Sequence, residues 1–456
     1  MSDPSSNDSA QAYELPDGER PTAATPTEAE IKSAPAPHDP YAALRFRNYR
    51  FYVASYSIAV VGGQIQTAAI DWELYQRTHS KLLIGILGLV QFLPIFLLAL
   101  PAGQAVDIFD RRKILLLTQL FLSLFGLAMA INSRYLGGAG HTVAFASCAL
   151  AILFLNGISL TFARPARASI LPHIVPQALF PNAVTWNTSM FEVAWMTGAA
   201  VGGAVVYFSP VWAYILNAVL LLICFMVTLP LPSVRAAEKK AVNFRSLIAG
   251  VRFVFDTRLL VATMTLDLFA VLLGGATYLL PIFAQDILHV GGIGYGWLRA
   301  APAIGAMCMA LVVAHMPPMK HAGRNLLFAV AGFGLATVVF GLSRNYWLSL
   351  AMLFLTGAFD NISVVVRHTL VQLLTPDPMR GRVSAVNQLF IGSSNELGGF
   401  ESGVTAEYLG LIRSVVFGGI GTVLVVLGVA SLWPQLRRLG PLNEVQPEPA
   451  KAESPV

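Results

Sequence analysis

The sequence predicts an all-α membrane protein with twelve transmembrane helices in two parallel six-helix halves. Its mean hydropathy is +0.63. Of its 456 residues, 55% are hydrophobic and only 12% are charged, about half the charged share of soluble domains. Such a chain cannot cover itself with polar side chains, so its solvent is lipid. An internal repeat in this apolar sequence predicts the division into halves.

The repeat joins residues 150–204 to residues 350–404 with unchanged spacing. The run LFLNG at Leu153–Gly157 is followed by LFLTG at Leu353–Gly357. Each matched pair is 200 residues apart (367 − 167 for the first): Arg167 and Arg367, Pro176 and Pro376, Asn187 and Asn387, Gly198 and Gly398, Gly203 and Gly403. Chance matches are common among Leu and Ala, but not among Arg, Pro, Asn and Gly.

Apolar segments of about 20 residues can cross a bilayer as helices. We expect spans at 49–75, 82–106, 113–132, 142–164, 182–208, 211–230, 258–285, 293–315, 325–342, 346–366, 384–408 and 413–433. The predicted organisation is a disordered tail (1–40), an N-terminal half (41–230), a linker (231–257), a C-terminal half (258–433) and a second tail (434–456). The first tail has no apolar core, so no cleavable signal peptide is expected.

The basic residues predict the orientation, because cytoplasmic loops are enriched in Lys and Arg. They gather on the side of the N-terminus, as in Arg111-Arg112-Lys113 after the second span, whereas the opposite loops hold few. The pI near 9.1 therefore reflects anchoring in a lipid bilayer and not a nucleic-acid partner. We expect a monomer of the inner membrane with both termini in the cytoplasm.

The loop after the second span reads GQAVDIFDRRK from Gly103 to Lys113. It resembles the signature loop G-x-x-x-D-R-x-G-R-R/K of the major facilitator superfamily. The resemblance implies a cytoplasmic gate in which Gly103 permits close helix approach and Asp107, with Arg111 and Arg112, latches the opposite half.

Two residues depart from that signature, since Ile108 replaces its first Arg and Asp110 its second Gly. A weaker latch would follow. The equivalent loop of the second half, Pro317–Arg324, keeps basic residues but has no Asp, so the gate is expected to be asymmetric. A plain positive turn is the alternative interpretation.

Gly198, Gly202 and Gly203 in the fifth span resemble the G-P-x-x-G-G antiporter motif of the superfamily, with Ala199 in place of the Pro. The motif favours export. Small residues at this spacing also let helices pack closely, and a packing face is the alternative. Further segments, among them 44–52 and 380–385, resemble one branch of the superfamily, which includes enterobactin-exporter-like and macrolide-efflux-like proteins. The resemblance covers about residues 42–438.

Ionisable groups inside the bilayer indicate functional sites, because each costs about 2.5–3.5 kcal/mol there. Glu192 and Glu396 fall near the midplane at 1.5 Å per residue, on helices related by the repeat. They suit a proton or a cationic substrate. The alternative is local capping, for instance by Asn187 or Asn395.

Asp267 lies deep in the seventh span, where we expect a coupling or substrate role or else a salt bridge to a neighbouring helix. Asp360 stands two turns before Arg367 near the cytoplasmic end, which favours an inner-gate ion pair to the other half over contact with the substrate. Arg167, the repeat counterpart of Arg367, is assigned to the same gate.

Four further residues complete the predicted binding set. Arg299 is expected to pair with an acidic group near the outer vestibule, and Asp71 and Glu73 are assigned to that vestibule or to interfacial solvation. Trp195 is the best aromatic candidate for the cavity, although Trp also gathers at membrane interfaces.

No enzyme or cofactor motif is expected. The chain lacks a glycine loop followed by Lys-Ser/Thr, so it should not hydrolyse ATP, and its His residues have no metal-like spacing. The three widely separated Cys residues are interpreted as packing residues.

The resemblance and the buried acids together predict a proton-coupled exporter of a small amphipathic molecule (drug, siderophore or metabolite) that works by alternating access. An uptake symporter and a non-transporting membrane receptor remain the alternatives.

Overall fold

The structure is a computed structural model that describes residues 41–138, 140–234, 244–316, 319–376 and 379–442. Within these residues, eleven helices are long and apolar enough to cross a membrane. A further helix, α14 (Arg380–Leu409), has 30 residues and thus the length for a twelfth span. The predicted all-α membrane fold is confirmed. The predicted tail 1–40 and most of the second tail lie outside the described residues.

The N-terminal half contains six long helices: α2 (Arg47–Thr78), α3 (Lys81–Ile108), α4 (Arg111–Tyr135), α5 (Thr142–Ile174), α6 (Phe180–Phe208) and α7 (Pro210–Thr228), with short turns η1 (Ala42–Arg45) and η2 (Gln177–Leu179). Polar caps start several of them. Ser80 Oγ accepts a hydrogen bond from the Leu83 N–H at 3.2 Å before α3. Asp110 Oδ1 accepts one from the Arg112 N–H at 3.0 Å before α4.

The C-terminal half repeats this order: α9 (Arg258–Leu273) with η3 (Ala276–Leu279), α10 (Leu280–Ile282) and η4 (Phe283–Ile287), then α11 (Gly292–His315), α12 (Ala322–Leu342), α13 (Tyr346–Leu374), α14 and α15 (Leu411–Leu432). A four-residue helix, α16 (Pro434–Arg437), follows α15. The predicted polar linker contains a helix of its own, α8 (Phe244–Asp256).

The seventh span is broken at Gly274-Gly275, whereas the Gly-Gly pair of the first span, Gly62-Gly63, lies inside the continuous helix α2. Packing explains the glycines of the seventh span. A Cβ on Gly274 would lie 2.5 Å from the ring of Phe333, and one on Gly275 would lie 2.9 Å from the carbonyl oxygen of Gly398. Both positions therefore require glycine because neighbouring helices of the C-terminal half lie so close.

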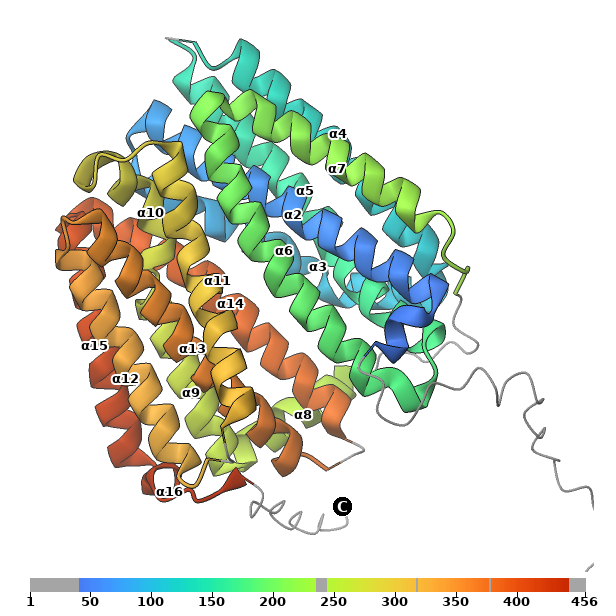
Figure 1. Cartoon of the computed structure of the whole chain (residues 1–456), viewed down its shortest axis with the longest axis vertical. Helices are drawn as coiled ribbons and strands as arrows, with labels where there is room; N and C mark the ends of the chain where they lie inside the picture. Colours follow the sequence, from blue (N-terminus) through green and yellow to red (C-terminus); the bar gives the residue numbers. More distant parts are fainter. Residues whose placement is uncertain (1–40, 139, 235–243, 317–318, 377–378, 443–456) are drawn as a thin grey trace, which may run out of the picture.

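Figure 1 shows the N-terminal half (blue to green) beside the C-terminal half (yellow to red), with α6 against α11. α3 packs against α14 in the same pseudo-symmetric way. Because the helices alternate in direction, the ends that carry Arg111, Arg112 and Arg258 lie on one side of the bundle. We call this side the basic end, and the other side the opposite end.

Candidate functional site

A salt bridge joins the two halves toward the opposite end. Arg299 Nη1 of α11 lies 2.5 Å from Asp71 Oδ2 of α2, and each side chain is only 15% exposed. The guanidinium also donates to Tyr295 Oη at 3.2 Å and to Gln64 Oε1 at 3.3 Å. The structure thus pairs Arg299 with an acidic group of the predicted outer vestibule, and that pair connects α2 to α11.

Further contacts between α2 and the broken seventh span lie beside this salt bridge. Tyr75 Oη donates a hydrogen bond to Asp286 Oδ2. Gln285 Nε2 donates to the carbonyl oxygen of Trp72 at 3.3 Å, and the Trp72 ring lies 5.2 Å from the ring of Tyr295. The last third of α2 is therefore held by η4 and α11 together.

Two close contacts between glycines, related by the pseudo-symmetry of the halves, also join the halves at the opposite end. A Cβ on Gly85 of α3 would lie 2.9 Å from the Cα of Gly403 in α14, and a Cβ on Gly296 of α11 would lie 2.9 Å from the Cα of Gly203 in α6. Bulkier residues would separate the halves here. Gly85 and Gly296 were not among the predicted residues, although their separation (296 − 85 = 211) nearly equals that of Gly62 and Gly274 (274 − 62 = 212).

The remaining glycines of the predicted antiporter motif pack inside the N-terminal half. A Cβ on Gly198 would lie 2.7 Å from the carbonyl oxygen of Val61, and one on Gly202 would lie 3.0 Å from the Cα of Ile65. These two glycines let α6 approach α2. Gly203 alone of the three meets the other half.

Glu73 belongs to a buried network and not to an open vestibule. Its side chain is 0% exposed. Oε1 accepts hydrogen bonds from Ser133 Oγ at 2.5 Å and from Arg77 Nε at 2.8 Å, and Oε2 accepts one from Tyr214 Oη at 2.8 Å. Because all four residues lie in the N-terminal half, this geometry corrects the assignment to the vestibule and favours a structural role.

A second ion pair lies inside the C-terminal half. Arg367 Nη1 of α13 contacts Asp267 Oδ2 of α9, and Arg367 Nε donates to Ser363 Oγ at 3.2 Å. This is the salt bridge to a neighbouring helix that the sequence analysis gave as its alternative for Asp267. The expected ion pair from Asp360 to the other half is not among the salt bridges of the described residues.

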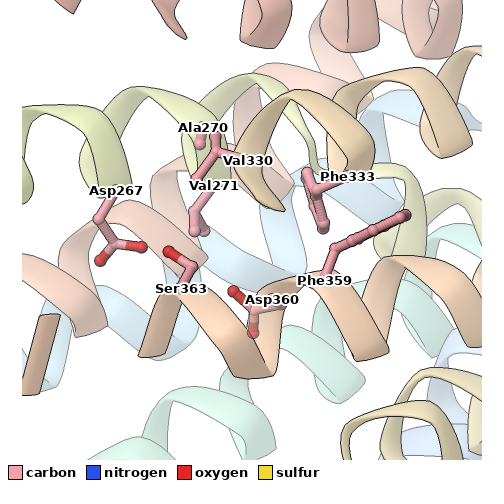
Figure 2. Close-up of a pocket in the computed structure, with 8 residues that line it drawn as sticks. All are labelled: Asp267, Ala270, Val271, Val330, Phe333, Phe359, Asp360 and Ser363. Atoms are coloured by element: carbon pink, nitrogen blue, oxygen red, sulfur yellow. The ribbon is translucent and has the colours of Figure 1, made fainter. Parts of the chain in front are cut away.

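Asp267, Asp360 and Ser363 border a small cavity between α9, α12 and α13 (Figure 2). The view shows Ser363 between the two carboxylates, with Phe333 and Phe359 on the apolar side. The cavity has a volume of about 10 Å³, which is enough for about one water molecule. Asp360 has no salt-bridge partner among the described residues, so the cavity is bordered by one paired carboxylate and one without a cation.

The two glutamates that were predicted near the midplane are both half-buried. Glu192 lies on α6 of the N-terminal half, and Glu396 lies on α14 of the C-terminal half. Glu396 meets the other half, since a Cβ on Gly88 of α3 would be 3.5 Å from its Oε2. The two carboxylates thus lie on pseudo-symmetric helices of opposite halves.

An aromatic row runs beside Glu192 in the N-terminal half. Ring centroids are 5.8 Å apart for Tyr56 and Phe191 and 5.6 Å apart for Phe191 and Trp195. Trp195 is 39% exposed. The guanidinium of Arg167 lies 4.5 Å from the Tyr56 ring, so this predicted gate residue contacts its own half, as a cation–π partner.

At the basic end, Asp107 has no ion-pair partner among the described residues. A Cβ on Gly103 would meet no atom within 4 Å, so the expected close helix approach is absent in this arrangement. Arg111 Nη1 donates to the Ser169 carbonyl at 3.1 Å, and Arg112 Nη2 donates to the Leu229 carbonyl. Both arginines thus bind within their own half, and the latch across the halves stays a prediction.

Asp110, which departs from the signature, has a clear local role. Its Oδ2 accepts a hydrogen bond from Ser233 Oγ at 2.6 Å, and its Oδ1 caps α4. Burial opposes ionisation, but the hydrogen bonds from Ser233 and from the backbone N–H groups that follow outweigh it and lower the pKa of this carboxyl. A glycine could not provide this cap.

Comparisons with known proteins agree with this geometry. Residues 38–451 match the model of the family described as transmembrane secretion effector. The staphyloferrin A transporter of Staphylococcus aureus is 21% identical over 83% of this chain and 94% of its own length. The multidrug efflux pump Tap of Mycolicibacterium fortuitum is 24% identical over 84% and 94%. The enterobactin exporter EntS of Citrobacter koseri is 23% identical over 88% and 94%.

Among solved structures, a variant of the nucleoside transporter NupG superposes with a TM-score of 0.68 at 10% identity, covering 85% of this chain and 100% of that one. This likeness shows the fold. The chain is therefore an integral membrane transporter and not an enzyme. It belongs to the transmembrane secretion effector family of the major facilitator superfamily.

Proposed function

We propose that this transporter exports a small amphipathic molecule, such as a drug, a siderophore or a related metabolite, in exchange for protons. Its relatives include an efflux pump and siderophore exporters, which supports the direction. The arginines of the basic end support an orientation with both termini in the cytoplasm, and we propose that the protein is a monomer of the inner membrane. The substrate would enter from the basic end, because the halves meet at the opposite end.

The observation that carries this proposal is that two carboxylates, those of Asp267 and Asp360, border one cavity that has a single guanidinium, that of Arg367, beside it. Asp267 is paired with Arg367. Asp360 borders the same small cavity as Asp267 and has no salt-bridge partner among the described residues. Uncompensated charge is costly within the membrane, so binding one proton or one cationic group would relieve the cluster.

The substrate surface would combine charge with aromatic area. Trp195 and Phe191 offer flat apolar faces beside Glu192. Glu396, half-buried at similar depth on α14, offers a second carboxylate. A molecule with a cationic or hydrogen-bonding head and an apolar ring system fits such a surface.

Transport by inside-out membrane vesicles with an acidic lumen tests this proposal directly. An antiporter releases lumenal protons and concentrates substrate inside, so we expect uptake of at least one probe from a panel of cationic dyes, macrolides and catecholate siderophores. Asp360→Asn and Glu396→Gln should each lose the gradient-driven part of that uptake. Glu407→Gln, an exposed acid on the same α14, should retain it.

The other outcomes separate the alternatives. An uptake symporter would carry the probe out of the acidic lumen together with protons. A receptor would move none of the panel. Wild-type, gradient-driven uptake by both Asp360→Asn and Glu396→Gln would refute the assignment of these acids to coupling.

A further inference from the structure

A basic groove lies at the basic end of the C-terminal half, away from the acid cluster. Its volume is about 390 Å³, and its lining comes from the start of α9 and from the segment that runs from the end of α15 through α16. The lining residues are Arg258, Leu432, Trp433, Pro434, Gln435 and Arg438. Nothing in the transport proposal uses this groove.

The groove carries two uncompensated positive charges. Arg258 and Arg438 line it, and no carboxylate does. Among the described residues, neither guanidinium has a salt-bridge partner. The nearest acid in sequence, Asp256, points its carboxylate toward Arg252 at 3.9 Å. An anion is therefore the ligand that the charge of this groove favours.

The start of α9 adds hydrogen-bond donors to the same place. Its N-cap residue Thr257 makes no side-chain cap, because Thr257 Oγ1 donates instead to the Phe253 carbonyl at 2.9 Å. The first-turn N–H groups beside Arg258 thus have no side-chain acceptor. The positive end of the helix dipole reinforces the attraction of the two arginines for an anion.

The surroundings favour a lipid over a soluble anion. Leu432, the last residue of α15, is 73% exposed, and Phe255, just before α9, is 60% exposed. Trp433, which follows Leu432 in the sequence, lines the groove together with the two arginines. Tryptophan beside arginine at the end of a span is typical of the membrane–water boundary.

We propose that this groove binds the phosphate of an anionic phospholipid headgroup. Arg258 and Arg438 would bind the phosphate oxygens, Gln435 would donate a further hydrogen bond, and the acyl chains would follow Leu432 along α15. Such a lipid would bridge the start of α9 and α16, two segments at the edge of the C-terminal half.

Native mass spectrometry of the full chain, with added phosphatidylglycerol or phosphatidylcholine, tests the site. We expect tighter binding of phosphatidylglycerol to the wild type. The double variant Arg258→Gln, Arg438→Gln should bind it about thirtyfold more weakly, because each interfacial arginine contributes about fivefold. The matched control is Arg344→Gln, Arg413→Gln, which removes two exposed arginines at the opposite end and should change binding little.

Two results would overturn the proposal. Equal loss in both double variants would indicate a diffuse charge effect and no specific site. Displacement of phosphatidylglycerol by millimolar inorganic phosphate would identify a soluble-anion site instead. If the double variant does not fold, Arg438→Gln alone, which lies beyond the last span, should still weaken binding about fivefold. Failure here would leave the transport proposal unaffected, since vesicle uptake is measured separately.

Discussion

Three acidic residues that were predicted to bind a proton or the substrate have different partners in the structure. Glu73 is hydrogen-bonded inside its half, Asp71 pairs with Arg299 across the halves, and Asp267 pairs with Arg367 within its half. Sequence spacing sets the depth of a residue along its helix, but not the neighbour that its face meets. The depth of these acids was therefore predictable, whereas their partners depend on packing between distant segments.

Arg367→Gln should destabilise the protein strongly. It would leave the buried carboxylate of Asp267 without its cation, and breaking a buried pair on one side costs about 3–5 kcal/mol. The free energy of unfolding in detergent measures this loss. Asp267→Asn combined with Arg367→Gln should recover most of it, and a double variant as unstable as the single one would contradict the pairing.

Asp110 predicts a dependence of stability on acid pH. Its pKa is lowered from 3.8 in the folded protein, so its contribution is present above pH 3.8 and is lost as the pH falls through the folded pKa. Asp110→Ala should lower the free energy of unfolding by about 1 kcal/mol at pH 7. The difference from wild type should shrink below pH 3.8, and a constant difference down to pH 2 would contradict this account.

Helices were the most predictable elements of this protein. Each of the twelve expected spans coincides with a helix or with the broken segment from α9 to η4, because span length and apolarity are local properties. The break at Gly274-Gly275 was not predictable, since the same dipeptide at Gly62-Gly63 continues a helix. Close neighbours do not distinguish the two sites, since a Cβ on Gly62 would lie 2.7 Å from Asn217 Oδ1 and one on Gly274 would lie 2.5 Å from the ring of Phe333.

The glycine contacts between helices give a prediction at this scale. Gly296→Val places side-chain atoms where Gly203 now lies, so α11 and α6 should separate at the opposite end, at a cost of about 1–3 kcal/mol. Alkylation of a cysteine at Trp72, in a background without the native cysteines, should become faster. Gly63→Val is the control, because a Cβ there meets no atom within 4 Å. Equal alkylation rates in both variants would refute the contact.

The molecule as a whole is closed at the opposite end by contacts of three kinds. They are the Asp71–Arg299 salt bridge, the hydrogen bonds of η4, and the paired glycines. The four arginines of the predicted gate bind within their own halves: Arg111, Arg112, Arg167 and Arg367. In alternating access, only one end of the transporter is open at a time. Opening of the opposite end should therefore be accompanied by closure of the basic end.

The most direct test of this account measures two distances by pulsed electron paramagnetic resonance. Spin labels at Tyr135 and Tyr408 report the opposite end, and labels at Leu117 and Leu311 report the basic end; all four positions are exposed. Arg299→Gln should lengthen the first distance and shorten the second, and Asp71→Arg with Arg299→Asp should restore both. If Arg299→Gln leaves both distances unchanged, or lengthens the first without shortening the second, the coupled exchange of the two ends is contradicted.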